Sequence, residues 1–180
     1  MSIAPGSPIV ALVMGVSGSG KTTIGELLAG ALHCPFFDAD SFHSPESIAK
    51  MKSGVPLTEA DRLPWLRRIA AKIDALLRDG ESAVIACSAL KRSYRDMLEC
   101  GRPNVALVFL EGSYDLIRQR VEARRGHFMP PSLLKSQFDE LQAPTPDENA
   151  ITVDVAPSPP EIVRAILREI EARRAAKGAA

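Results

Sequence analysis

Several features that would assign a specialised class of protein are scarce in this sequence. Its three cysteines, Cys34, Cys87 and Cys100, form no C-x-x-C pair, so we expect free thiols in a reducing cytoplasm rather than disulfides or a zinc site. Its 22 basic residues equal its 22 acidic residues, which leaves no basic excess for binding nucleic acid. Its apolar runs are too short to span a bilayer, and residues 1–7 are expected to be a flexible leader without signal-peptide character.

What remains is the sequence of one three-layer α/β domain over residues 1–180. Short apolar runs alternate with helical patterns, which is typical of a parallel sheet covered on both faces. A capping box, Thr58 to Asp61, precedes the helical stripe Leu63–Leu76. The expected strands are Ile9–Met14, Pro35–Asp38, Ala83–Cys87, Val105–Leu110 and Ile151–Val155. The other expected helices are Lys21–Leu32, Ser44–Lys52, Leu90–Glu99, Tyr114–Arg124, Ser132–Leu141 and Pro160–Arg174, with a frayed tail at 175–180.

The segment GVSGSGKT, Gly15–Thr22, matches the G-x-x-x-x-G-K-[ST] pattern of a phosphate-binding loop. It follows an apolar strand and precedes a helix, which is the context that the motif requires. Lys21 would reach the β- and γ-phosphates, and the Thr22 hydroxyl would bind Mg²⁺. We therefore predict a site for ATP and Mg²⁺. The nucleotide-binding residues would be Gly15, Val16, Ser17, Gly18, Ser19, Gly20, Lys21, Thr22 and Thr23.

The sequence lacks the features of two larger classes of phosphate-loop protein. A GTPase needs an Asn-Lys-x-Asp guanine reader, but Asn104 and Asn149 are followed by valine and alanine. A hydrolytic motor usually ends a strand in an acidic, magnesium-binding residue, whereas the strand at Ala83–Cys87 continues into Ser88-Ala89-Leu90. The class that remains is a small kinase that transfers the γ-phosphoryl group to a bound acceptor.

Two carboxylates, Asp38 and Asp40, follow the second expected strand. Being two residues apart on an extended segment, they would point to the same side and face the phosphate loop across the crevice at the sheet's carboxyl edge. One can help to hold magnesium, and the other can orient an acceptor hydroxyl and take its proton. Alternatively, the pair consists of solvated turn residues or caps the next helix.

Four longer motifs resemble those of the gluconate kinase family. They are FDADSFHSPESIAKMKSGVPLTEADRLPWL (37–66), CSALKRSYRDML (87–98), RVEARRGHFMP (120–130) and QFDELQAPTPDE (137–148). The resemblance implies transfer of phosphate from ATP to D-gluconate, giving 6-phospho-D-gluconate for pentose phosphate or Entner–Doudoroff catabolism. It also implies a five-stranded phosphate-loop NTPase fold like that of shikimate and nucleoside monophosphate kinases, and a homodimer. A kinase of another aldonate or of shikimate, and a non-catalytic ATP-binding protein, remain as alternatives.

Gluconate presents a carboxylate and a row of hydroxyls, so its site needs cations and polar partners. Arg62 is a candidate for the carboxylate because its planar fork can bind it bidentately. Lys91 and Arg95, four residues apart on one expected helix, would share a face and reach the acceptor, and His43 would bond a sugar hydroxyl. The alternative for each is an ordinary surface or helix-start position. Trp65 is expected in the core rather than under the sugar.

An arginine-bearing lid is expected at about residues 120–140. Arg120 and Arg124 lie four apart on one helix, and Gly126 with two prolines then breaks it. By the resemblance, Arg120 would contact the nucleotide and Arg124 the phosphates; the alternative is a solvated helix face. In the mechanism that we expect, Asp40 receives the acceptor's proton while Lys21, Arg120 and Arg124 neutralise the transferred charge, with Asp38 and Thr22 at the metal.

Overall fold

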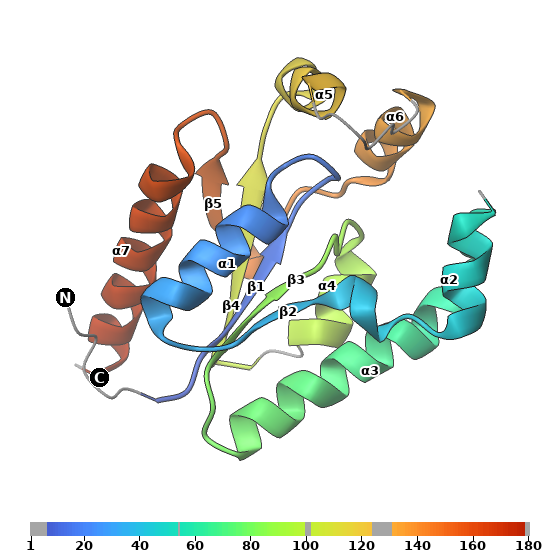
Figure 1. Cartoon of the computed structure of the whole chain (residues 1–180). Helices are drawn as coiled ribbons and strands as arrows, with labels where there is room; N and C mark the ends of the chain where they lie inside the picture. Colours follow the sequence, from blue (N-terminus) through green and yellow to red (C-terminus); the bar gives the residue numbers. More distant parts are fainter. Residues whose placement is uncertain (1–6, 54, 100–101, 124–130, 179–180) are drawn as a thin grey trace.

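The computed structural model describes residues 7–53, 55–99, 102–123 and 131–178. Within them, one parallel sheet has the strand order β2-β3-β1-β4-β5 (Figure 1). The strands are β1 (Val10–Met14), β2 (Phe36–Asp38), β3 (Ala83–Ala86), β4 (Val105–Glu111) and β5 (Ile151–Asp154). This sheet confirms the predicted fold class, and no strand end differs from its prediction by more than one residue.

Helices connect the strands throughout the described chain. They are α1 (Lys21–Leu32), α2 (Pro45–Lys52), α3 (Glu59–Arg78), α4 (Arg92–Glu99), α5 (Tyr114–Ala123), α6 (Pro131–Glu140) and α7 (Pro159–Gly178), with two short 3₁₀ helices, η1 (Ala39–Phe42) and η2 (Pro146–Glu148). Several helix ends differ from expectation by one residue. The larger differences are that α3 extends beyond the predicted stripe at both ends, α4 begins two residues late, and α7 continues past Arg174 into the expected tail. None of the described helices combines the length and apolarity needed to cross a membrane.

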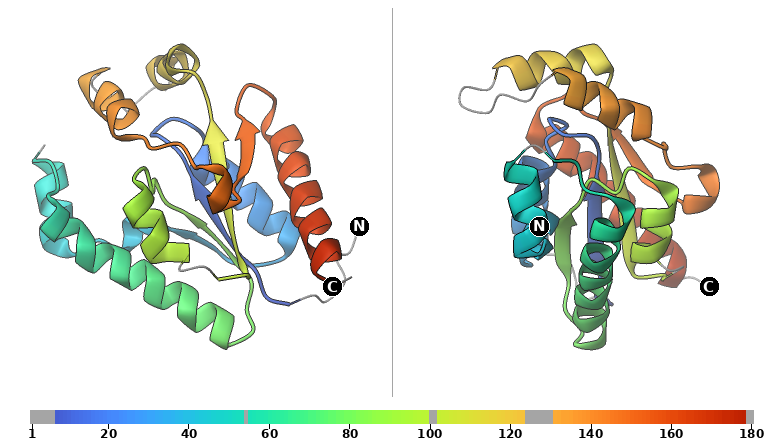
Figure 2. Two further views of the ribbon diagram at one scale, coloured as in Figure 1. Left: turned by 180° about the vertical axis from the view of Figure 1, so that it is seen from behind. Right: turned by 90° about the vertical axis from the view of Figure 1, so that its right-hand side faces the viewer.

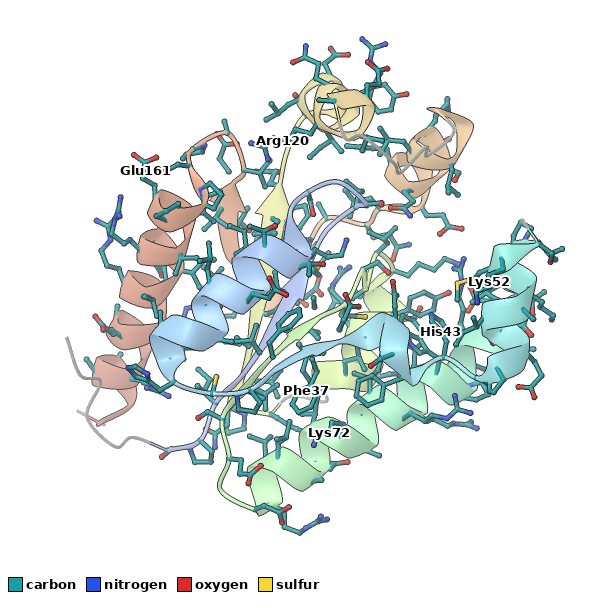
Figure 3. All side chains as sticks on the ribbon, viewed as in Figure 1. Phe37, His43, Lys52, Lys72, Arg120 and Glu161 are labelled. Carbon is teal, nitrogen blue, oxygen red and sulfur yellow. The ribbon has the colours of Figure 1, made fainter. Side chains whose placement is uncertain are left out.

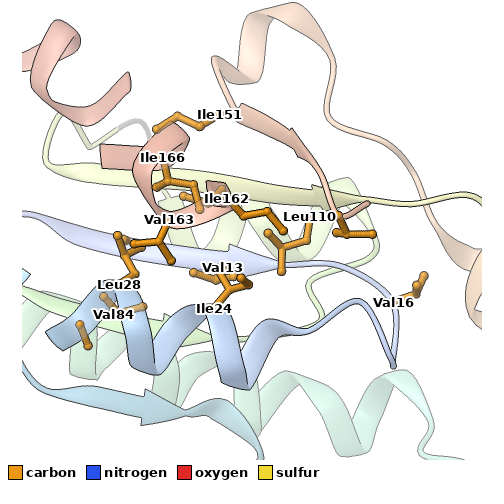
Figure 4. Close-up of a cluster of buried hydrophobic side chains, with 14 of the residues drawn as sticks. Val13, Val16, Ile24, Leu28, Val84, Leu110, Ile151, Ile162, Val163 and Ile166 are labelled. Carbon is orange, nitrogen blue, oxygen red and sulfur yellow. The ribbon is translucent and has the colours of Figure 1, made fainter. Parts of the chain in front are cut away.

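The sheet is buried on both faces. Helices α1 and α7 cover one face, and α3 and α4 cover the other (Figures 1 and 2). Because side chains alternate along a strand, Ala11 and Val13 of β1 join the cluster under α1 and α7, whereas Leu12 joins the cluster under α3. In Figure 4, Val13 lies against Ile24 and Leu28 of α1. Two-sided burial explains why the strands appear in the sequence as continuous apolar runs.

The N-terminus of α3 is fixed by the capping box that the sequence predicts. The Asp61 N–H donates to the Thr58 hydroxyl at 3.3 Å, and the Thr58 N–H donates to the Asp61 carboxylate at 2.9 Å. Asp61 also accepts from Lys50 of α2 at 2.7 Å. The first turn of α3 is therefore held against α2.

Strand order brings three chain segments together at the carboxyl edge of the sheet. β1 leads into Gly15–Thr22, β2 leads into η1, and β3 leads into the loop before α4. β2 and β3 lie to one side of β1, and β4 and β5 to the other. Ligands of open α/β sheets bind at such a switch point, where the connections diverge.

Candidate active site

The glycine-rich loop wraps tightly around the N-terminus of α1. Gly18 and Gly20 have φ values of +84° and +98°, a region that other residues rarely adopt, and Gly20 immediately precedes α1. A Cβ atom at Gly18 would lie 2.5 Å from a methyl carbon of Val121 on α5. The Lys21 ammonium donates to the Val16 carbonyl at 3.1 Å, across the base of the loop. Such a loop at a helix N-terminus can bind an anion through its backbone N–H groups.

Asp38 and Asp40 are related differently from the extended geometry that the sequence suggested. The chain turns into η1 directly after β2, and the Asp38 carboxylate accepts the Asp40 N–H at 3.0 Å. Asp38 thus caps η1, the 3₁₀ helix that contains Asp40, whereas the next helix, α2, is capped by Ser44. Asp40 is exposed, yet partial desolvation and the nearby charge of Asp38 raise the pKa of its carboxyl, opposed by His43 and Lys21. A raised pKa suits a carboxylate that accepts a proton.

His43 lies flat on Trp65. The two rings are 4.5 Å apart between centroids and 9° from parallel. Trp65 is 5% exposed and donates its indole N–H to the Ala39 carbonyl at 2.7 Å, which confirms its expected place in the core. Burial lowers the pKa of His43, favouring the neutral ring, although Asp40 opposes this. Its Nδ1 is buried without a hydrogen-bond partner among the described residues.

Arg62 and Lys91 meet around Tyr94. Arg62 donates to the Tyr94 hydroxyl at 3.2 Å, and that hydroxyl donates to Glu59 at 2.7 Å. Lys91 also bonds Glu59, at 2.5 Å, while Arg62 lies 3.6 Å from the carboxylate of Glu140 on α6. Both cations therefore lie in one polar cluster, each beside a protein carboxylate.

The structure corrects the acceptor-binding role that the sequence predicts for Arg95. Its side chain is 1% exposed and forms a two-pronged ion pair with Glu148, with N–O distances of 2.5 and 2.8 Å. It also donates to the carbonyls of Ala89 and Leu90, each at 3.2 Å. With its donors committed, Arg95 cannot serve as the acceptor-binding residue that the sequence suggested. It does not share a helical face with Lys91 either, because Lys91 precedes α4.

Of the two arginines that the sequence predicts for a lid, the structure describes only Arg120. Arg120 on α5 donates to the Val155 carbonyl after β5 at 2.6 Å, whereas Arg124 lies outside the described residues. Figure 3 shows Arg120 and His43 well separated along the edge of the sheet. Packing of Tyr114 edge-on against Phe138, at 5.3 Å between ring centroids, connects α5 to α6.

Sequence reasoning missed Gln137 on α6. Its side-chain carbonyl accepts the Ser17 backbone N–H of the glycine-rich loop at 2.6 Å. A single glutamine within an ordinary helix gives no sequence signal for this contact, because 120 residues separate the partners. Tyr94 was missed for a similar reason, since a buried tyrosine is equally consistent with a core position.

Together, the sheet order, the glycine-rich loop after the central strand and the Asp40 carboxyl, whose pKa is affected by the charge of Lys21, define a small P-loop kinase. A family model described as shikimate kinase matches residues 17–171. The relatives that the chain matches include gluconokinases from animals and bacteria.

The chain is 46% identical to a probable gluconokinase of Mus musculus over 185 residues, covering 92% of this chain and 99% of the relative. It is 47% identical to the thermosensitive gluconokinase of Escherichia coli (strain K12) over 140 residues, covering 78% and 75%. The crystal structure of a gluconokinase from Sinorhizobium meliloti 1021 superposes with a TM-score of 0.82 at 46% identity, covering 93% and 94%. The chain therefore belongs to the gluconokinase family and is a phosphotransferase enzyme.

Proposed function

We propose that this enzyme transfers the γ-phosphoryl group of ATP to D-gluconate, giving ADP and 6-phospho-D-gluconate. The observation that carries the proposal is the position of Asp40 in η1, directly after β2, at the same edge of the sheet where β1 leads into the glycine-rich loop with Lys21. The raised pKa of the Asp40 carboxyl supports it. This is the arrangement that transfer requires, with a proton acceptor on one side and a phosphate-binding cation on the other. The names of the gluconokinase relatives supply the acceptor.

The nucleotide half of the site would be Gly15–Thr23. Its backbone N–H groups would cradle the phosphates, and Lys21 would leave the Val16 carbonyl to bind the β- and γ-phosphates. Arg120 would contact the nucleotide from its place beside Val155, and Arg124 would neutralise charge on the transferred group.

The residues present fit a magnesium ion carried by the nucleotide. The described residues hold no group of three or more His, Cys, Asp or Glu side chains placed to bind a metal. Magnesium at kinase sites usually takes one or two protein ligands, with phosphate oxygens and water completing the shell. The exposed Thr22 hydroxyl and the Asp38 carboxylate are oxygen donors of the right kind. When bound, the ion would neutralise charge on the phosphates.

The acceptor half would be built around Asp40. Its carboxylate would orient the terminal hydroxyl of gluconate and accept its proton during transfer. Arg62 and Lys91 would bind the gluconate carboxylate at the far end of the chain. His43, held neutral and flat on Trp65, would bond a hydroxyl between them.

Replacement of Asp40 tests this assignment. We expect Asp40→Asn to lower kcat by about 10²–10⁴-fold, the usual contribution of a general base, with little change in ATP affinity. ADP release coupled to a dehydrogenase measures kcat, and Asp139→Asn, which changes an exposed carboxylate on α6, is the matched control. Near-normal turnover in Asp40→Asn would contradict its role as the base.

A panel of acceptors tests the substrate. Gluconate, its epimers, other aldonates, shikimate and nucleoside monophosphates would be assayed with the wild-type enzyme under identical conditions. We expect gluconate to give the highest kcat/KM. A higher value for another acid would reassign the acceptor, and ATP binding without transfer to any of them would favour a non-catalytic nucleotide-binding protein.

We also propose that the enzyme is a cytoplasmic homodimer. Cys34 and Cys87 are free thiols, which suits a reducing compartment, and the dimer rests on the family resemblance alone. Light scattering coupled to size-exclusion chromatography measures the assembly. A mass of one chain, near 19.4 kDa, would contradict the dimer.

A further inference from the structure

Helix α6 places two oxygen atoms in the two halves of the proposed site. Gln137 Oε1 accepts the Ser17 N–H in the glycine-rich loop at 2.6 Å. Glu140 Oε2 lies 3.6 Å from Nη1 of Arg62. Gln137 and Glu140 are three residues apart, so they project from neighbouring positions on one helical face. The same face of α6 thus contacts a nucleotide-binding segment and an acceptor-binding side chain.

Each oxygen has the chemistry of the ligand that its partner would bind. A phosphate oxygen accepts hydrogen bonds from backbone N–H groups of a phosphate loop, as the Gln137 carbonyl does from Ser17. A gluconate carboxylate would pair with Arg62, as the Glu140 carboxylate does. One N–H forms one short, well-aligned bond at a time, and two carboxylates crowded on one guanidinium repel each other. Ligand and α6 therefore compete for the same donors.

Apolar contacts also hold α6 in place. Leu134 is 1% exposed and packs in the hydrophobic cluster under α1 and α7. Phe138 packs edge-on against Tyr114 of α5. The outer face of the helix carries an exposed pair, Lys135 and Asp139, joined at 2.7 Å. Substitutions at Gln137 and Glu140 therefore remove the competing oxygens while the packing of the helix is kept.

We propose that the inner face of α6 is a built-in competitor of both substrates. Gln137 occupies a backbone donor that a nucleotide phosphate takes, and Glu140 pairs with the arginine that the gluconate carboxylate takes. This inference rests on the proposed function, because it assigns the two donors to those ligands. It predicts the direction of the change in affinity: removal of either oxygen strengthens binding of the corresponding ligand. A residue that contacts the ligand, or that only supports the fold, gives weaker or unchanged binding when replaced.

Titration calorimetry on the whole chain measures whether the affinities rise or fall in the variants. Gln137→Met keeps the side-chain volume and removes the acceptor, so we expect β,γ-imido-ATP with Mg²⁺ to bind about two- to tenfold more tightly, as one neutral hydrogen bond allows. Glu140→Gln removes the charge, so we expect D-gluconate to bind about two- to fivefold more tightly, as one partly exposed ion pair allows. Lys135→Ala and Asp139→Asn are the controls on the outer face and should leave both affinities unchanged.

The outcomes separate this inference from the proposed function. Weaker or equal binding in both variants, with unchanged melting temperatures, would overturn the competitor role of α6. Gln137→Asn is a second variant should Gln137→Met fold poorly; its side chain is too short to reach Ser17, and it should also tighten nucleotide binding. If the wild-type enzyme binds the nucleotide but no gluconate, the proposed acceptor is overturned instead. The nucleotide affinity of Gln137→Met then still tests whether Gln137 competes with the nucleotide.

Discussion

Replacement of Arg95 by methionine should destabilise the protein and leave gluconate binding unchanged. The substitution keeps an unbranched aliphatic stem and removes the guanidinium, which leaves Glu148 charged and buried, with only 3% of its side chain exposed. Removing one partner of a buried ion pair typically costs about 3–5 kcal/mol. Glu148 keeps a hydrogen bond from the Thr145 N–H at 2.9 Å, which favours the lower end, about 3 kcal/mol.

In a chain of 180 residues, that loss lowers the melting temperature by about 6–12 °C. Thermal unfolding followed by circular dichroism measures this change. KM for gluconate is measured at a temperature well below the unfolding transitions of the wild type and the variant. Arg92→Met is the matched control on the same helix: its partner Asp147 is 62% exposed, so the melting temperature should change little. The double variant Arg95→Met, Glu148→Met should recover part of the loss, because it also removes the buried charge.

The pH dependence gives a second signature of this pair. The hydrogen bonds from Arg95 lower the pKa of Glu148 below its ordinary value of 4.5. The pair therefore contributes its full stability above that value and loses it as pH falls through the lowered pKa. Arg95→Met should lack this part of the acid dependence. Wild-type melting behaviour together with a raised KM for gluconate would refute the structural role and restore Arg95 as an acceptor ligand.

Three further predictions concern the proposed catalytic and metal-binding groups. Lys21→Ala should abolish phosphoryl transfer in the coupled ADP-release assay, and retained activity would exclude Lys21 from the mechanism. Because the pKa of Asp40 is raised, kcat should fall at acid pH around an apparent pKa above the ordinary value of 3.8, as the base becomes protonated. Asp38→Asn removes a charge that raises this pKa, so the acid limb of the kcat–pH profile should move to lower pH. An unmoved limb would show that another group limits the rate.

The helices and strands could be predicted from the sequence because the patterns that mark them are local. Strands buried on both faces appear as apolar runs, and the capping box at Thr58 combines partners only three residues apart. The start of α4 was missed by two residues because the Leu90 carbonyl accepts the Gln142 N–H at 2.9 Å and the Arg95 guanidinium at 3.2 Å, contacts that come from outside the first turn. Ala89, just before it, has a φ of +42°. Few residues outside glycine adopt that conformation, and here Arg95 bonds the Ala89 carbonyl.

The roles of individual charged residues could not be read from the sequence, because they depend on partners distant along the chain. The partner of Arg95 is 53 residues away, and the spacing to Lys91 suggested a shared face that a late helix start removes. Asp38 ends β2 and Asp40 lies in η1, so the turn into η1 replaces the extended geometry assumed for them. Periodicity identifies the faces of regular elements, and it gives no information at the loops where a site is built.

The polar cluster around Tyr94 limits how much affinity charge pairing can supply in the proposed acceptor site. Arg62 and Lys91 lie beside the carboxylates of Glu140 and Glu59. In the proposed function, an acceptor carboxylate would therefore exchange one ion pair for another instead of pairing with unpaired cations. Such an exchange yields little net free energy, because the desolvation cost and the pairing gain resemble those of the bond that is lost. Discrimination must then come from hydroxyl positions between Asp40 and Arg62. A sugar acid of similar charge but altered hydroxyl geometry would therefore lose kcat more than binding.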